Sequence, residues 1–177
     1  VGVAPKTVYY DRRHFVGQEM PSSAEINVRP TYRQTNPEEP ASESYVYVAS
    51  TNGVVFAVND RTGKVVWEFT TGKHINQRLA VIGDQVFVPV QEGGMHCIDA
   101  LKGEEIWFAP NVKKFVAMSN HRLYVLDMRM RLAALSLQSG ARYDTFLDAA
   151  GYKDVLFNLD TDRIYLTTTT GLVQCLR

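Results

Sequence analysis

Residues 46–67 read V-Y-V-A-S-T-N-G-V-V-F-A-V-N-D-R-T-G-K-V-V-W, and this pattern recurs along the chain. Two short apolar runs lie at residues 46–48 and 55–58. The first is followed by a turn that ends in Gly53, and the second by a turn that ends in Gly63. Short runs of β-branched and aromatic residues between glycine-containing turns are typical of antiparallel strands joined by hairpins. We therefore predict strands, and no long helix, on both sides of each glycine.

The pattern returns 40 residues further on without a gap, and again after shifts of 37 and 41 residues. Two positions keep their residue type in all four copies. One is always aromatic: Tyr47, Phe87, Tyr124 and Tyr165. The other is always small and apolar: Ala57, Cys97, Ala134 and Cys175. Further apolar segments lie between successive copies, at residues 78–82, 114–118 and 155–159. Each copy of about 40 residues is therefore predicted to hold four antiparallel strands. That unit is the blade of an all-β propeller.

The repeat divides the chain into an N-terminal non-repeat segment, residues 1–44, and a propeller domain, residues 45–177. The propeller domain contains three complete copies and one incomplete copy, which makes about four blades. Four blades permit three arrangements: a small closed ring, a homodimer that completes an eight-bladed ring, or a part of a longer chain.

Two short strands are predicted inside the non-repeat segment, at residues 6–10 and 24–28. Copy one lacks its innermost strand and copy four lacks its outermost, so these two strands could close the ring and remove its open sheet edges. The alternative is that residues 1–44 form an extension, or a remnant of earlier blades, that takes no part in closure.

The sequence also predicts the conformation of several turns. The pair Asn52-Gly53 predicts a type I′ turn, and Met130 stands where the other copies have glycine, so that its turn is expected to be strained or of another type. In the second turn of each copy an Asn, Asp or Ser side chain is expected to bond the backbone while a glycine adopts the left-handed conformation. These pairs are Asn59 with Gly63, Asp99 with Gly103, and Ser136 with Gly140.

Charge and hydropathy argue against several classes of partner. The chain has 19 Lys+Arg against 19 Asp+Glu, with no run of basic residues, so nucleic acid is not expected as a partner. The longest apolar stretches, 53–58 and 132–137, are far shorter than the roughly 20 residues that cross a bilayer, so no transmembrane span is expected.

Residues 46–67 closely resemble the blade consensus of the PQQ-like (pyrroloquinoline-quinone-like) repeat family, and copy two keeps that consensus through Gly103 and Trp107. The resemblance covers about residues 45–177. This family includes the quinoprotein alcohol dehydrogenases and the non-enzymatic BamB-like assembly proteins of the bacterial outer membrane. The resemblance implies that Trp67 and Trp107 dock between neighbouring sheets. Copy three has Asp144 at that position, so one sheet interface should lack the indole ring.

A quinoprotein dehydrogenase would, by this resemblance, bind calcium and the quinone with a catalytic aspartate and two adjacent cysteines. Cys97 and Cys175 are not adjacent, and their small apolar position predicts that both are buried fillers. His96 is predicted to lie on a blade surface rather than to bind a ligand. The other histidines lie in the non-repeat segment, in the link between the first two copies and in a turn: His14, His74 and His121.

The carboxylates show no catalytic motif. Glu104 and Glu105 are expected at a solvated hairpin edge, and the aspartates of the second half fall mostly at turns, where Asp bonds the backbone. These are Asp127, Asp144, Asp148, Asp154, Asp160 and Asp162. We predict no catalytic, cofactor-binding or metal-binding residue, and no cofactor.

Two functional classes remain. The first is a non-catalytic binding or scaffold propeller of the bacterial cell envelope, periplasmic or outer by resemblance to the BamB-like proteins, which engages a protein partner through loops and blade edges. The alternative is a quinoprotein-type oxidoreductase, or a fragment of one, that binds pyrroloquinoline quinone. Recurring residues have structural tasks here, and variable residues on a regular disc suit recognition, so we expect the first class and no enzyme activity.

Overall fold

The structure is a computed structural model that describes residues 6–8, 44–119 and 121–176. These residues form fifteen strands, arranged in four antiparallel sheets, and no helix. In the described part there is accordingly no helix of the length and hydropathy that a membrane span requires. The all-β propeller architecture predicted from the repeat is confirmed.

The sheets follow the chain in order. The first contains β1 (Lys6–Val8), β2 (Tyr45–Ala49), β3 (Val54–Asn59) and β4 (Val65–Thr70). The second contains β5 (Ala80–Ile82), β6 (Gln85–Val90), β7 (Gly94–Asp99) and β8 (Glu105–Pro110). The third contains β9 (Val112–Met118), β10 (Arg122–Asp127), β11 (Arg131–Ser136) and β12 (Arg142–Asp148). The fourth contains β13 (Asp154–Val155), β14 (Ile164–Thr167) and β15 (Val173–Leu176).

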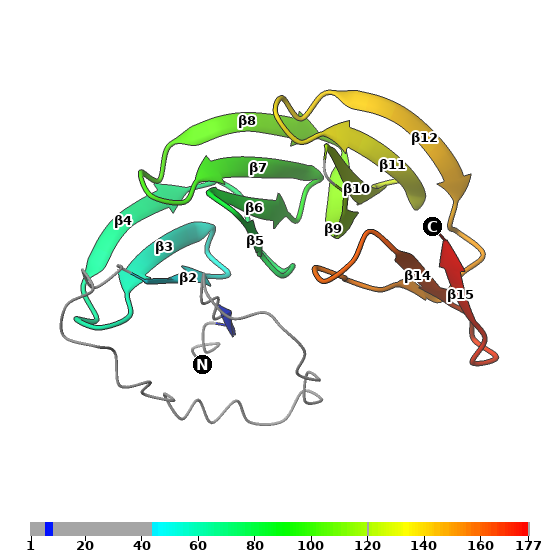
Figure 1. The fold of residues 1–177 in the computed structure, drawn as a ribbon, viewed down its shortest axis with the longest axis horizontal. Coiled ribbons are helices and arrows are strands. Elements are labelled where there is room, and N and C mark those ends of the chain that lie inside the picture. Colours follow the sequence, from blue (N-terminus) through cyan, green and yellow to red (C-terminus); the bar gives the residue numbers. More distant parts are fainter. Residues whose placement is uncertain (1–5, 9–43, 120, 177) are drawn as a thin grey trace, which may run out of the picture.

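Figure 1 shows the four sheets along an arc, with β4, β8 and β12 on its outer side. The first and fourth sheets lie at its two ends, and the described residues do not close it into a ring. β1 is the innermost strand of the first sheet and pairs with β2, with Lys6 opposite Ala49. The second expected N-terminal strand, residues 24–28, lies outside the described residues. Closure of the ring by residues 1–44 therefore stays a prediction.

Successive sheets pack face to face, because side chains alternate between the two faces of a strand. One face of the first sheet, with Val55 and Ala57, packs against Val86, Val88 and Ile98 on the opposite face of the second sheet. The second and third sheets repeat this arrangement around Phe87, and the third and fourth around Leu166. Each interface is a separate hydrophobic core.

The two tryptophans join neighbouring sheets, as the resemblance implied. Trp107 lies on β8 of the second sheet, and its Nε1 donates a hydrogen bond to the carbonyl oxygen of Leu137 in the third sheet at 3.1 Å. A Cβ atom on Gly140 would lie 2.5 Å from the Trp107 ring, so only glycine fits under it. Trp67 makes the equivalent contacts with Ala100 and Gly103. The third sheet has exposed Asp144 at this position, so its interface with the fourth sheet lacks the ring, as predicted.

The hairpin turns differ from one expectation. The predicted type I′ turn at Asn52-Gly53 is wrong, because that turn needs positive φ at both residues and only Gly53 has it, at 92°. The N–H of Gly53 donates a hydrogen bond to the carbonyl oxygen of Ser50, three residues earlier. In the equivalent turn of the third sheet, the N–H of Met130 donates to the carbonyl oxygen of Asp127. Met130 adopts φ of 61°, so this residue is strained, which was one of the two outcomes expected.

The second turns behave as predicted. The Asn59 and Asp99 side chains accept hydrogen bonds from the backbone two and three residues further on, and Ser136 accepts one three residues further on. The glycines of these turns have positive φ: Gly63 at 67°, Gly103 at 74° and Gly140 at 67°.

The fourth sheet departs from two expectations. Its first strand was expected to continue to residue 159, but β13 ends at Val155, and Asn158 N–H bonds the Val116 carbonyl of the third sheet instead. The prediction that both cysteines are buried is right for Cys97 and wrong for Cys175, which is exposed. Among the described residues β15 is an edge strand, so no outer strand shields that position.

Candidate functional site

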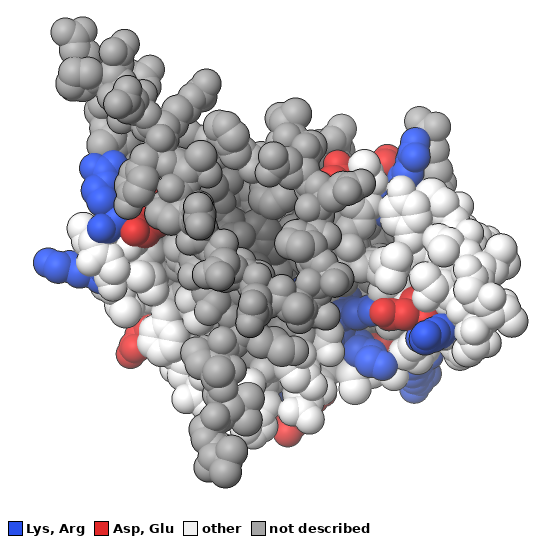
Figure 2. Space-filling model, turned by 90° about the horizontal axis from the view of Figure 1, so that it is seen from below, with Lys and Arg blue, Asp and Glu red and all other residues white. Residues whose placement is uncertain are grey.

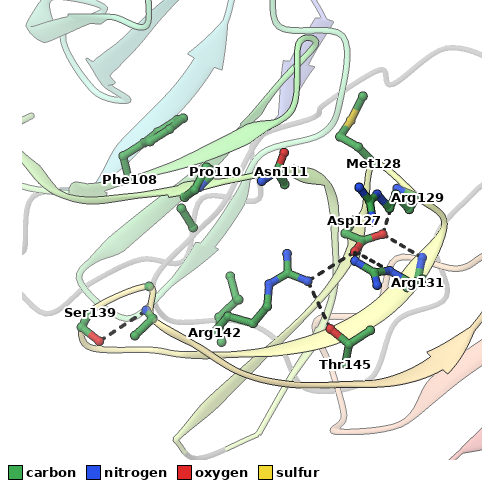
Figure 3. Close-up of a pocket in the computed structure, with 14 residues that line it drawn as sticks. Phe108, Pro110, Asn111, Asp127, Met128, Arg129, Arg131, Ser139, Arg142 and Thr145 are labelled. Carbon is green, nitrogen blue, oxygen red and sulfur yellow. Dashed lines mark hydrogen bonds and ion pairs between the residues drawn. The ribbon is translucent and has the colours of Figure 1, made fainter.

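A hollow of about 550 Å³ lies between the second and third sheets (Figure 3). The end of β8, from Phe108 to Pro110, forms one wall together with the following Asn111, and the third sheet forms the other. The third sheet contributes the turn between β10 and β11 and the hairpin between β11 and β12. We call this hollow the arginine groove, because Arg129, Arg131 and Arg142 line it.

Asp127, the last residue of β10, organises the groove. Its side chain is 3% exposed, and its Oδ1 accepts hydrogen bonds from the backbone N–H groups of Arg129 and Arg131, both at 2.9 Å. Its Oδ2 accepts from Nε and Nη2 of Arg131, at 3.0 and 2.8 Å, and from Nη1 of Arg142 at 3.3 Å. Both carboxylate oxygens are therefore occupied by N–H donors.

These donors determine the ionisation of Asp127. Burial acts to raise the pKa of the carboxyl, but the hydrogen bonds from Arg131 and Arg129 and the charge of Arg131 outweigh burial and hold the pKa below its usual range. Asp127 is consequently a carboxylate at neutral pH.

The three arginines outnumber this one carboxylate. Arg142 also donates from Nη1 to Oγ1 of Thr145 at 3.3 Å, while its Nε and Nη2 make no hydrogen bond within the described part of the chain. Arg129 is exposed, and its side chain has no ion-pair partner among the described residues. The groove therefore has an excess of positive charge and unused guanidinium donors.

The second sheet shows that the fold does not require these groups. The 37-residue shift places Asp127, Arg129, Arg131 and Arg142 at the positions of Val90, Glu92, Gly94 and Glu105. Both sheets have the same four strands and turns. The four departures from the repeat, which come from two consecutive hairpins, meet in one groove, which is what a binding site grafted on a regular scaffold produces.

Of two exposed apolar side chains near the groove, only Met128 borders it. Phe108 is 41% exposed, but its ring packs on Gly94 and lies 4.7 Å from His96, which contacts Phe69 of the first sheet. The Phe108 ring therefore lies on the face of the second sheet that is turned away from the third sheet, and Trp107 and Ala109 occupy the other face. Met128 is 45% exposed and lines the groove, with its side chain resting on Gly93. The groove thus combines cationic surface with one apolar side chain.

On the face of the molecule that Figure 2 shows, the positive charges of the described residues are spread out. Figure 2 shows one face of the molecule, on which the blue Lys and Arg side chains of described residues lie close to red Asp and Glu side chains rather than in one broad basic area. A second hollow, of about 590 Å³, lies between the third and fourth sheets and is lined by Arg122 together with Asp160 and Asp162. Its carboxylates outnumber its arginine, so it lacks the cationic excess of the arginine groove.

The histidines lie apart from this groove or take no part in it. His96, expected on a blade surface, is 9% exposed and packs between the rings of Phe69 and Phe108, with centroids at 5.5 and 4.7 Å. Burial lowers the pKa of His96, and Glu105, with a carboxylate oxygen 3.5 Å from Nδ1, acts in the opposite direction. Nδ1 of His74 lies 2.8 Å from the Thr51 carbonyl oxygen in the hairpin of the first sheet.

The remaining sequence candidates are dispersed. His121 is exposed, and His14 lies outside the described residues. Asp148 and Asp154 lie at strand ends and accept hydrogen bonds from nearby backbone N–H groups, as expected. Asp144 lies inside β12, and it accepts a hydrogen bond from the N–H of Thr145. Both thiols are free, and burial raises the pKa of Cys97 to about 12.

Calcium binding does not fit the arginine groove. Calcium prefers oxygen ligands, but both oxygens of Asp127 accept N–H donors and the other charged groups are cations. In the described part of the chain, no three or more His, Cys, Asp or Glu side chains form a group that could hold a metal ion. The expectation of no cofactor stays a prediction.

Asp127 and Met130 were noticed in the sequence, but only as a turn residue and as a departure from glycine. The roles of Arg129, Arg131 and Arg142 were missed. The signal available was the comparison between copies, since Arg stands at two positions where copy two has Glu.

Comparison with known proteins gives one family and a shared fold. The family profile described as "Outer membrane protein assembly factor BamB" matches residues 22–149, which is more than half of the chain. No curated protein sequence matches the chain significantly.

Three solved structures illustrate the fold. BamB from Moraxella catarrhalis is 20% identical with a TM-score of 0.58, and the match covers 75% of this chain and 46% of that one. The computationally designed Ika4 protein is 13% identical with a TM-score of 0.59, covering 76% of this chain and 86% of that one. A quinohemoprotein alcohol dehydrogenase from Pseudomonas putida HK5 is 15% identical with a TM-score of 0.54, covering 71% and 27%. This chain therefore spans about half the length of the BamB structure.

Proposed function

The chain belongs to the PQQ-like repeat family of the outer membrane protein assembly factor BamB, and on this premise we propose that it is a non-catalytic binding propeller of the bacterial cell envelope. It engages a protein partner through loops and blade edges, in the periplasm or at the outer envelope. The family's fold carries both non-catalytic proteins and dehydrogenases, so the fold alone does not choose between binding and catalysis.

The observation that carries the proposal is the arginine groove. Its charged residues have no counterpart in the second sheet, where Val90, Glu92 and Glu105 serve the same strands and turns. Met130 holds a strained backbone conformation in the same turn, where glycine would be at ease. Backbone strain, and exposed donors without a partner among the described residues, are expected where a chain binds something else.

The test compares capture of envelope proteins by chemical cross-linking. Purified protein is incubated with a bacterial envelope extract, and cross-linked partners are identified by mass spectrometry for the wild type and for the Arg129→Glu, Arg142→Glu double variant. Arg61→Glu, an exposed arginine in a turn of the first sheet, is the matched control for charge reversal. A partner captured by wild type and by the control, but lost in the double variant, supports the proposal; equal capture by all three refutes a role for the groove.

The alternative is a quinoprotein-type oxidoreductase, or a fragment of one. It is tested by incubating the protein with pyrroloquinoline quinone and calcium and then measuring quinone absorption and alcohol oxidation with a dye acceptor. Stoichiometric quinone binding with turnover would overturn the proposal of a non-catalytic protein. Assembly of two chains into an eight-bladed ring also stays a prediction, for which the molar mass from sedimentation equilibrium is the measurement.

A further inference from the structure

We propose that the arginine groove binds an acidic segment of a protein partner, with a carboxylate held by Arg142 and Arg129 and a neighbouring apolar side chain lying on Met128. This inference rests on the proposed function in so far as the partner is a protein. It adds the chemistry that the partner must present.

The residues that line the groove give it a net positive charge. Three guanidinium groups line the groove against the single carboxylate of Asp127, which leaves two positive charges uncompensated among the lining residues. Asp148 lies opposite Arg131 in the register of β11 and β12, but it does not line the groove. Its carboxylate accepts a hydrogen bond from the N–H of Ala150. A ligand with negative charge is therefore favoured in the groove over a neutral one.

The hydrogen bonds of Asp127 fix the positions of two of the arginines. Asp127 accepts hydrogen bonds from Arg131 and Arg142 together, so it holds two mutually repelling cations side by side (Figure 3). Asp127 acts here as a positioning residue, because neither of its oxygens is left for a ligand. Arg142 is fixed through Nη1 alone, and its Nε and Nη2 form a free fork among the described residues. Such a planar fork matches the two oxygens of a carboxylate.

The groove suits an acidic peptide better than it suits nucleic acid. Nucleic-acid binding depends on many cations along an extended surface, whereas this chain has zero formal net charge and the groove is lined by only three arginines and one aspartate. Met128, which lines the groove and is 45% exposed, presents apolar surface next to these cations. A hollow of about 550 Å³ lies within the size range of small-ligand sites, so it has room for a carboxylate side chain and a neighbouring residue. Carboxylates beside an apolar residue fit both surfaces.

The repeat provides a matched variant for the test. Arg129→Glu and Arg142→Glu introduce the residues that the second sheet has at these positions, Glu92 and Glu105, so the strands and turns are known to accept them. Arg129→Glu alone is the safeguard variant, because the Arg129 side chain is exposed and bonds no described residue. Circular dichroism and the urea midpoint establish that each variant is folded.

The probe is a fluorescein-labelled peptide of sequence GDEFDG, and binding is measured by fluorescence anisotropy at low and high ionic strength. We expect the wild type to bind it and high salt to weaken binding. Arg129→Glu should lower the affinity by about tenfold, and the double variant by more, since each charge-assisted contact contributes about one power of ten. Arg142→Lys should also weaken binding, because a lysine keeps the charge but not the fork.

Three comparisons decide the ligand class. The amide peptide GNQFNG should not bind, and loss of the phenylalanine in GDEADG should weaken binding. Equal affinity for GDEFDG in wild type and double variant would overturn the assignment to the groove. Displacement of the peptide by a single-stranded DNA oligonucleotide or by succinate at equal concentration would overturn the acidic-peptide class. If GDEFDG does not bind although envelope cross-linking to the groove persists, this inference fails and the proposed function stands.

Discussion

Trp107 and Gly140 offer a direct measurement of how one sheet is attached to the next. The Trp107 ring is 8% exposed, covers Gly140 of the third sheet and bonds the Leu137 carbonyl. Trp107→Ala removes this buried ring and should lower the free energy of unfolding by about 3–5 kcal/mol. The value is measured by urea denaturation followed by far-ultraviolet circular dichroism, with linear extrapolation to water.

Substitution of the glycine separates the contact with the ring from backbone strain. Gly140 and Gly63 both have φ of 67°, but a Cβ atom would meet the Trp107 ring at 2.5 Å in Gly140 and nothing within 4 Å in Gly63. Gly63→Ala should therefore cost only the left-handed backbone, about 1–2 kcal/mol. Gly140→Ala should cost about 1–3 kcal/mol more, since the added methyl group overpacks the contact.

The double variant tests whether the two residues act on each other. Once the ring is absent, Gly140→Ala should cost no more than Gly63→Ala, so the Trp107→Ala, Gly140→Ala pair should be non-additive by about 1–3 kcal/mol. Additive effects, or equal costs for Gly140→Ala and Gly63→Ala in the wild-type background, would show that the ring does not rest on this glycine.

Three other predictions follow from the same structure. Trp67→Ala should destabilise less than Trp107→Ala in urea denaturation, because the Trp67 ring is only half-buried; a larger loss would contradict this. Asp127→Asn should lower the free energy of unfolding by about 1–3 kcal/mol at neutral pH. Because the folded-state pKa of Asp127 is lowered, that difference should persist above the unfolded pKa of about 3.9 and vanish as pH falls through the folded pKa, and a pH-independent difference would refute it. Iodoacetamide should label the native protein once, at exposed Cys175, whereas Cys97, whose pKa is raised to about 12, should react only after unfolding; mass spectrometry of wild type and Cys175→Ser checks both thiols.

Much of the fold was predictable because its signals are local. The alternation of residues 46–48 and 55–58 predicts strands, and glycines such as Gly63 and Gly103 identify turns that need positive φ. The type I′ turn at Asn52-Gly53 was predicted wrongly, since the same dipeptide also suits a turn in which only the glycine is left-handed. Turn type depends on how many residues the hairpin encloses, and a dipeptide does not specify that number.

The candidate site was predictable only in part. Comparison of the copies singles out Met130 and Asp144 as departures, and Arg129 and Arg142 replace Glu92 and Glu105 of copy two. This comparison identifies positions that the scaffold does not require. It does not show that the positions are neighbours, because they belong to two different hairpins.

Distances between hairpins and between sheets depend on tertiary packing. The four-stranded blades follow from short-range hydrogen bonding and side-chain alternation, which any segment of about 40 residues carries within itself. The approach of Arg142 to Asp127 depends on the register of β12 and β10 on either side of β11 within the third sheet. The approach of both residues to the end of β8 depends on the angle at which the third sheet packs on the second. That angle is set by the buried interface around Phe87 and Phe115, whose residues come from two blades. Exposure of Cys175 has the same origin, because burial of its position requires a neighbouring strand or sheet that the repeat pattern of one blade does not contain.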